Sequence, residues 1–205
     1  MDKLELKTFI TGELHDNCYL IIDQESKQCF MVDCPAPTDE IDKFIQAQGL
    51  QVLFIALTHA HFDHISGLGK SSSPFYVHPE DVCLLTDPRL NGSVFFSSFV
   101  VIKKEPYLYD QEKPLEFKGH IINVIHTPGH TPGSVSLKLD NWLFSGDTIF
   151  FDSVGRTDIP LASHDVLIKG IKEKILTLAP QTVIYPGHGS ATTVEREKKH
   201  NPFLI

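Results

Sequence analysis

The apolar run VLFIAL, residues 52–57, leads directly into THAHFDH, residues 58–64. A continuous apolar run of this length predicts a strand that is buried on both faces. Three histidines and one aspartate therefore follow a buried strand immediately. This feature favours a fold in which a sheet lies between other layers and carries polar side chains in the loop at one edge.

The spacing within THAHFDH predicts two neighbouring metal positions. His59 and His61 lie two residues apart and point the same way in an extended segment, whereas Asp63 and His64 follow after the chain turns. The four side chains therefore need not share one ion. Imidazole and carboxylate ligands suit Zn²⁺, and iron and manganese accept the same set. The alternative is a chance cluster in a histidine-rich chain.

Polar residues recur where other predicted strands end. β-like runs occupy residues 4–10, 18–22, 29–33, 75–78, 120–126, 134–139, 142–144 and 182–185. The polar residues at strand ends or in the following turns are Asp33, His59, His61, Asp63, His64, His130, Asp147 and His188. Core packing does not require such residues there, and adjoining glycines let neighbouring backbone approach closely. We therefore predict a metal site built from strand-end loops.

Helical patterns alternate with these strands. Residues 38–49 predict a helix that Thr38 caps and Gly49 ends, with Ile41, Phe44 and Ile45 on its apolar face. A second helix is predicted from Ser163 to about Leu178, and its apolar face comprises Val166, Leu167, Ile171, Ile175 and Leu178. A short polar helix precedes the terminal NPFLI. The alternation predicts an α/β fold.

Residues 86–111 predict a long irregular segment that contains Phe95, Phe96 and Phe99. Loops of this length are uncommon unless they are functional or disordered. Two interpretations of the three phenylalanines stay open. They form an apolar wall beside the site, or they are core residues.

Charge and composition exclude several classes of partner. A chain of 205 residues suits one domain, residues 1–205, and its net charge of −8 without a basic tract argues against nucleic acid and anionic membranes. Charges at positions 2, 3, 5 and 7 exclude a signal-peptide core, and no run approaches the ~20 apolar residues of a membrane span. We therefore expect a cytoplasmic protein whose four cysteines, which lack CxxC spacing, are reduced thiols. Its oligomeric state stays open.

The isolated histidines are expected to be surface or hydrogen-bonded residues, because a single histidine without a patterned partner is seldom a ligand. They are His15, His78, His120, His126, His164 and His200.

In chain order, THAHFDH, TPGHTPGS, SGDTIF and YPGHG resemble the metallo-β-lactamase superfamily across almost the whole chain. The resemblance implies an αββα sandwich, with two mixed β-sheets flanked by helices and a two-metal site between them. It implies that one metal is held by His59, His61 and His130, the second by Asp63, His64 and His188, with Asp147 as the bridge. Two zinc ions are expected, with iron or manganese as alternatives. A protein with only one of the two metal positions occupied is also compatible with the resemblance. Asp33, Thr58 and Arg156 are candidates for contacts behind the ligands, or alternatively structural residues of the turns.

Within the superfamily, HTPGHTPGS, VGRTD, PGHG and the terminal NPFL look most like the hydroxyacylglutathione hydrolase (glyoxalase II) group, in a short form. This likeness implies hydrolysis of S-lactoylglutathione or a related acyl thioester by metal-bound hydroxide, with Asp63 as both ligand and the group that orients the nucleophile. In that group an aromatic–lysine pair follows the GD turn and a Glu-Tyr pair follows the last histidine, and both lie near bound glutathione. The matching segments here are FDSVGRTD and GHGSAT, and the group's basic extension beyond NPFLI is missing. We therefore expect weak recognition of glutathione.

Two other functions stay open. Persulfide dioxygenases share the fold and a GRTD element, and one iron held by His59, His130 and an aspartate such as Asp147 would match a site of two histidines and one carboxylate. A non-enzymatic metal-binding module is the second alternative, although it predicts a damaged ligand set and the set here is intact.

Overall fold

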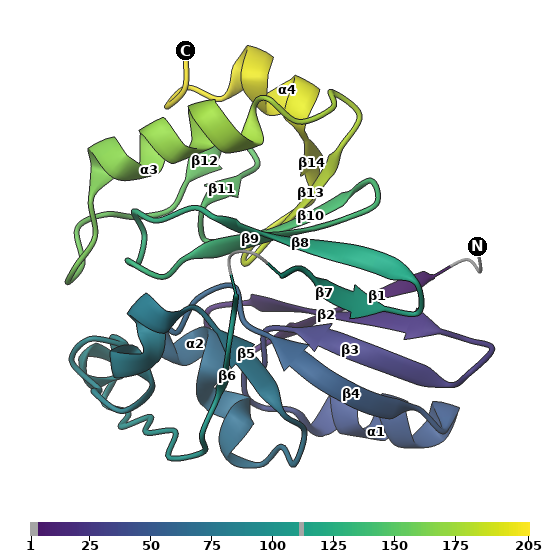
Figure 1. The fold of residues 1–205 in the computed structure, drawn as a ribbon. Helices are drawn as coiled ribbons and strands as arrows, with labels where there is room; N and C mark the ends of the chain where they lie inside the picture. Colours follow the sequence, from purple (N-terminus) through teal and green to yellow (C-terminus); the bar gives the residue numbers. More distant parts are fainter. Residues whose placement is uncertain (1–3, 111–112) are drawn as a thin grey trace.

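Two β-sheets lie face to face, and helices cover the outer face of each (Figure 1). This is a computed structural model that describes residues 4–110 and 113–205. Positions 2 and 3, whose charges entered the signal-peptide argument, and Gln111, the end of the expected irregular segment, lie outside the described residues. The predicted αββα architecture is confirmed.

The first sheet has the strand order β1-β2-β3-β4-β5-β6. Its strands are β1 (Glu5–Thr11), β2 (Asp16–Asp23), β3 (Gln28–Val32), β4 (Gln51–Ala56), β5 (Phe75–Val77) and β6 (Tyr107–Leu108). The strands from β3 to β6 run parallel, whereas β1 and β2 are antiparallel to their neighbours. The segments between them contain α1 (Asp39–Gln48), α2 (Phe62–Ile65) and short 3-10 helices at Ser66–Gly69, Pro79–Leu85 and Ser93–Phe96.

The second sheet has the order β14-β13-β10-β9-β8-β7. Its strands are β7 (Leu115–Phe117), β8 (His120–His126), β9 (Val135–Leu139), β10 (Trp142–Gly146), β13 (Val183–Pro186) and β14 (Thr192–Thr193). A separate hairpin pairs β11 (Ile149–Phe150) with β12 (Ser153–Val154). The helices of this half are α3 (His164–Gly170), a π-helix at Ile171–Ile175, and α4 (Val194–His200).

Strand β2 contributes alternate side chains to two hydrophobic cores, one on each face of the first sheet. Successive side chains of a strand point to opposite faces, and Leu20 and Ile22 pack with Ile41 of α1 on the outer side. Tyr19 and Ile21 instead join the core between the sheets, where the second sheet contributes residues such as Phe144. Both faces of the strand are buried. This burial explains the near-continuous apolar sequence.

Helix α1 begins and ends close to the predicted residues, but its cap differs. Gly49 adopts a left-handed conformation with φ 64° and ends the helix as expected. The hydroxyl of Thr38 donates to the carboxylate of Asp42 at 2.8 Å, and Thr38 makes no side-chain bond to a backbone amide of the helix. Thr38 therefore occupies the N-cap position as predicted, but its side chain does not cap the helix.

The predicted helix from Ser163 to Leu178 is not one regular α-helix, because α3 passes into a π-helix at Ile171. Leu167, Ile171 and Ile175 are fully buried against the second sheet. Val166 is exposed, since the residue next to Leu167 lies about 100° around the helix and faces away from the sheet. Placing Val166 on the buried face was therefore wrong.

The segment 86–111 contains more regular structure than expected. It includes the 3-10 helix Ser93–Phe96 and strand β6, which extends the first sheet beside β5. Phe95, Phe96 and Phe99 are 69%, 50% and 74% exposed. The interpretation of these phenylalanines as core residues was therefore wrong. Within residues 4–110 and 113–205, no helix has the length and apolar character needed to cross a membrane.

Candidate metal centre

Parallel pairing in the first sheet places Asp33 beside Thr58. Val32 of β3 pairs with Ala56 of β4, so the residues that follow the two strands leave the sheet at the same edge. The Asp33 carboxylate accepts hydrogen bonds from the Thr58 amide at 2.7 Å and from the Thr58 hydroxyl at 2.8 Å. Asp33 itself adopts a left-handed conformation with φ 60°. These bonds hold the start of THAHFDH against the sheet.

Parallel pairing in the second sheet brings Asp147 to His188 in the same way. Gly146 of β10 pairs with Pro186 of β13, and Oδ2 of Asp147 lies 3.5 Å from Nε2 of His188. A Cβ atom on Gly187 would lie 2.2 Å from the other Asp147 oxygen. Glycine is therefore required at position 187, because any side chain would displace the carboxylate.

The first group of ligand-type side chains comprises His59, His61 and His130, whose nitrogen atoms lie within 4.8 Å of one another. Nδ1 of His61 lies 2.8 Å from Nε2 of His130, and all three rings are buried. Burial lowers the pKa of His61 to about 3, and burial holds the pKa of His59 well below its ordinary value. The two imidazoles are therefore neutral at physiological pH, which is the form that binds metals.

The second group comprises Asp63, His64 and His188, together with Asp16, which the sequence had not indicated. The Asp16 side chain is buried and one of its oxygens lies 3.5 Å from Nδ1 of His188. Burial first, and the neighbouring Asp63 second, raise the pKa of Asp16 to about 6. The signal for Asp16 lay in the topology: β2 is antiparallel to β3, so the start of β2 meets the end of β3 at one edge.

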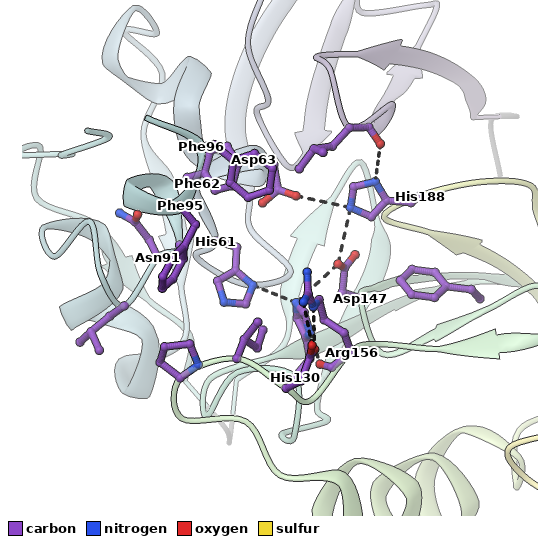
Figure 2. A pocket seen from close by; sticks show the side chains of 17 residues that line it. His61, Phe62, Asp63, Asn91, Phe95, Phe96, His130, Asp147, Arg156 and His188 are labelled. Atoms are coloured by element: carbon purple, nitrogen blue, oxygen red, sulfur yellow. Dashed lines mark hydrogen bonds and ion pairs between the residues drawn. The ribbon is translucent and has the colours of Figure 1, made fainter. Parts of the chain in front are cut away.

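Asp147 lies between the two groups (Figure 2). Its Oδ2 lies 3.4 Å from Nε2 of His130 in the first group and 3.5 Å from Nε2 of His188 in the second. Its Oδ1 lies 3.5 Å from Nε2 of His64. Burial opposes ionisation of Asp147, but the imidazoles of His64 and His188 outweigh it and hold its pKa well below the usual range. One ionised carboxylate thus reaches both groups.

Contacts behind the ligands turn the rings toward this centre. Nδ1 of His130 donates to the carbonyl of Arg156 at 2.9 Å, and Nδ1 of His188 donates to the carbonyl of Leu14 at 3.1 Å. Because a carbonyl oxygen only accepts, Nδ1 carries a proton in both rings, and Nε2 is the nitrogen that faces the centre. Arg156 therefore supports the site through its backbone, whereas its guanidinium pairs with Asp158.

Asp81 is a buried carboxylate that sequence reasoning missed. It accepts from the amide of Ala60 at 3.0 Å, the hydroxyl of Thr131 at 2.8 Å and the amide of Gly133 at 2.7 Å. Ala60 lies between two ligands of the first group, and Thr131 directly follows His130. One side chain thus ties the two loops of that group together. No pattern marked Asp81, because it follows the short strand β5 by several residues within a 3-10 helix.

Buried nitrogen and oxygen atoms without partners indicate that the centre fits metal ions. Nε2 of His59, Nε2 of His64 and Oδ1 of Asp147 are buried and have no hydrogen-bond partner. Such atoms are costly unless something satisfies them. Three imidazoles in one group, and carboxylates with imidazoles in the other, are donor sets that zinc, iron and manganese accept.

His78, Glu80 and His126 also bring ligand-type atoms close together. The rings of His78 and His126 stack at 4.1 Å with planes only 16° apart. Lone pairs of imidazole lie in the ring plane, so two nearly parallel stacked rings do not aim at a common point. We therefore treat this pair as a packing contact.

A cleft of about 600 Å³ opens over the centre. His61, Asp63, His130, Asp147 and His188 line its floor. Its other lining residues are Leu14, Phe62, Leu90, Asn91, Gly92, Phe95, Phe96, Phe150, Arg156, Asp158, Ile159 and Pro160. The volume is that of a site for a small-molecule ligand.

Residues 11–188 match the family model of the Metallo-beta-lactamase superfamily. The chain belongs to this superfamily. The probable metallo-hydrolase YqgX of Bacillus subtilis is 36% identical over 200 residues and covers 94% of each chain. The hydroxyacylglutathione hydrolase GloC of Haemophilus influenzae is 30% identical over 196 residues, and the match covers 92% of each chain.

Solved structures of the superfamily agree with the fold. The crystal structure of the BLEG-1 B3 metallo-beta-lactamase matches with a TM-score of 0.92 and 36% identity, over 98% of this chain and 100% of that chain. The structure of TTHA1623 in a di-iron-bound form matches with a TM-score of 0.81 and 32% identity, over 97% and 100%. The chain is thus a metallo-hydrolase-type member of the superfamily with a metal-binding cluster.

Proposed function

We propose that this chain is a metal-dependent hydrolase that cleaves S-lactoylglutathione or a related acyl thioester. The observation that carries the proposal is the position of Asp147, whose two oxygens reach both groups of ligand-type side chains at the floor of an open cleft. The likeness to GloC supports a thioester as the substrate class.

The two groups of side chains would hold two metal ions, which we expect to be zinc, with iron or manganese as alternatives. His59, His61 and His130 would hold one ion and Asp63, His64 and His188 the other. Ions bound here supply two kinds of chemistry, because they lower the pKa of a water and polarise the carbonyl of the substrate. The likeness to a di-iron-bound structure supports iron as the first alternative.

Asp63 is the residue to which we assign the positioning of the nucleophilic water. It lines the cleft, and its Oδ2 lies 3.5 Å from Nε2 of His188 and 3.9 Å from Nε2 of His64. A carboxylate in this position accepts a hydrogen bond from a water and holds it against the substrate carbonyl. The same carboxylate, which lines the cleft, would take up the proton that the water loses and give it to the thiolate that leaves the acyl carbon.

Asp33 and Thr58 are not among the residues that line the cleft, and they would act through the second group of ligands. Asp33 accepts from Nδ1 of His64 at 2.8 Å, so the proton stays on the far side of that ring and Nε2 faces the centre. Thr58 holds the Asp33 carboxylate through two hydrogen bonds. We assign both residues the role of fixing the ring and the loop that carry the second group.

Hydrolysis of β-lactams is the second candidate, and the likeness to the BLEG-1 B3 metallo-beta-lactamase favours it. The same residues can position water against an amide carbonyl. The persulfide dioxygenase alternative requires only one iron, so it gives no role to the second group of ligands and to the bridging position of Asp147.

The test is a comparison of substrates on one preparation of metal-loaded protein. Release of thiol from S-lactoylglutathione and from a simple acyl thioester, opening of a chromogenic β-lactam, and oxygen uptake with glutathione persulfide are measured in parallel. We expect thiol release that disappears in Asp147→Ala and persists in His200→Ala, which removes an exposed histidine of α4. Turnover of the β-lactam or of the persulfide without thioester cleavage would contradict the proposal.

A further inference from the structure

The 3-10 helix Ser93–Phe96 presents two aromatic rings beside the centre. Phe95 and Phe96 are 69% and 50% exposed, yet both line the cleft together with His61 and Asp63. Phe96 packs against Phe62 with ring centroids 4.8 Å apart. Figure 2 shows Phe95 beside His61, and Phe62 with Phe96 beside Asp63. Exposed apolar surface that adjoins ligand-type residues indicates a binding surface.

The base of this helix is anchored by buried polar groups. The Asn91 amide donates to the carbonyls of Leu84 and Val100 at 2.9 Å each, and its oxygen accepts from the Ser93 amide at 3.0 Å. The Ser93 hydroxyl accepts from the Val100 amide at 3.1 Å. Asn91 and Ser93 are fully buried. The two phenylalanines therefore stand on a fixed base, and their exposure is a property of the fold.

Other residues that line the cleft are also apolar. Phe150, Ile159, Pro160 and Leu14 line it, and the Phe150 ring lies 6.2 Å from the ring of His188. The metal-centre residues thus form a polar floor, and most of the other side chains that line the cleft are apolar. An occupant that extends from the floor over Phe95 and Phe96 therefore meets mainly carbon atoms.

Charges along the walls do not favour an anionic occupant. Among the described residues that line the cleft, Arg156 is the one arginine, and no lysine lines it. Its guanidinium makes two bonds of 2.8 Å to the two oxygens of Asp158, so it is already matched with a carboxylate. Beyond the metal centre, the carboxylates of glutathione would therefore find no lysine and no uncommitted arginine among these residues.

We infer that the preferred thioester carries an uncharged, apolar thiol half, and that Phe95 and Phe96 bind this half in preference to glutathione. The inference rests on the proposed function, because it names the substrate class of the same site. Burial of an apolar thiol half against the two rings is favourable in proportion to the area removed from water. A charged carrier gains little there, since desolvation of its carboxylates is not repaid.

The experiment measures kcat and KM of metal-loaded protein for three lactoyl thioesters that differ only in the thiol: benzyl mercaptan, N-acetylcysteamine and glutathione. We expect the benzyl ester to have the highest kcat/KM and the glutathione ester the lowest. In Phe96→Ser, kcat/KM for the benzyl ester should fall about tenfold, equivalent to ~1.4 kcal/mol, mainly through KM. The N-acetylcysteamine ester should change less than threefold.

The matched control is Phe99→Ser, because Phe99 belongs to the same segment and is 74% exposed but does not line the cleft. We expect this variant to behave as wild type, and Phe95→Ser to behave as Phe96→Ser. A higher kcat/KM for the glutathione ester overturns the inference, as does an equal loss in Phe96→Ser and Phe99→Ser. A shift from oligomer to monomer in Phe96→Ser without a kinetic effect overturns it too, since the rings would then contact another copy. If no thioester is hydrolysed at all, the proposed function itself fails.

Discussion

Oδ2 of Asp33 accepts a 2.8 Å hydrogen bond from Nδ1 of His64, a residue that lies 31 positions further along the chain. Both side chains are fully buried, so the bond is shielded from water. Burial alone would lower the pKa of His64, but the carboxylates of Asp33, Asp63 and Asp147 outweigh it and raise the pKa well above the usual value. The pair therefore controls both the direction and the protonation of one ring of the second group.

Asp33→Asn should weaken metal binding at the second group. An asparagine cannot accept from His64 and from both Thr58 donors, because its amide nitrogen only donates. Loss of a contact of this kind typically costs 10–100-fold in metal affinity. Metal content by elemental analysis and affinity by chelator competition measure the effect.

A matched control exists at Asp140, which also has a positive φ, 45°, and accepts from Nδ1 of His120 at 2.7 Å. Asparagine tolerates this backbone conformation, so Asp140→Asn removes the carboxylate charge from another aspartate–histidine pair without added strain. Its metal content and affinity should equal those of wild type. If both variants lose metal equally, Asp33 has no specific role.

Asp147→Ala should remove more metal and more activity than His188→Ala. The Asp147 carboxylate lies 3.4–3.5 Å from histidines of both groups, whereas His188 belongs to the second group only. We expect Asp147→Ala to lose both ions and His188→Ala to retain the ion of the first group. Equal losses in metal stoichiometry and in kcat/KM would contradict the bridging position of Asp147.

Metal binding should release protons, and mainly at the second group. Burial lowers the pKa of His188, but its hydrogen bonds to Asp147 and Asp63 outweigh this and raise that pKa to about 10, so the ring holds a proton at pH 7. The first group binds without such a release, because His61 has a pKa of about 3. Since a metal must displace the proton, affinity at the second group should fall as the pH falls.

Calorimetric titration of metal-free protein in two buffers of different ionisation enthalpy counts the protons. At pH 7 we expect the first ion to release fewer protons than the second. At pH 5.5 the second ion should bind at least tenfold more weakly than at pH 8. Equal proton release for both ions would show that the two groups do not differ in protonation.

Asp81→Ala should remove hydrogen bonds that hold the two loops of the first group in place. Three buried donors would lose their acceptor, and each unsatisfied donor costs ~1–3 kcal/mol. We expect a lower Tm and a weaker affinity for the first ion. Asp81→Asn keeps one acceptor oxygen and should fall between Asp81→Ala and wild type in both measurements. Wild-type metal affinity in a folded Asp81→Ala protein would exclude a supporting role for this residue.

The strand-end ligands could be predicted because a short motif places them locally: an apolar strand, a turn and then a histidine or aspartate. THAHFDH and PGHG each carry this information within a few residues. Asp81 and Asp16 could not be predicted in this way, because their roles depend on pairing between distant segments. The sequence shows where a strand begins, but the antiparallel arrangement of β2 decides that its beginning faces the site.

The solvent exposure of individual side chains was the second property that could not be predicted from the sequence. Phe95, Phe96 and Phe99 have the same side chain within five positions, yet only Phe95 and Phe96 line the cleft. Their places depend on a 3-10 helix of four residues and on the buried contacts of Asn91. The cytoplasmic location, the single-domain organisation and the partners stay predictions.

The most direct test of the proposed function is the rate of thioester hydrolysis in protein that has been stripped of metal with a chelator and then reloaded with zinc, iron or manganese. Wild type should lose thiol release on stripping and regain it on reloading, with two ions bound per chain at full activity. Asp147→Ala, treated identically, should regain neither metal nor activity. Undiminished hydrolysis by the metal-free protein, or no thioester hydrolysis by protein that holds two ions per chain, would contradict the proposed function.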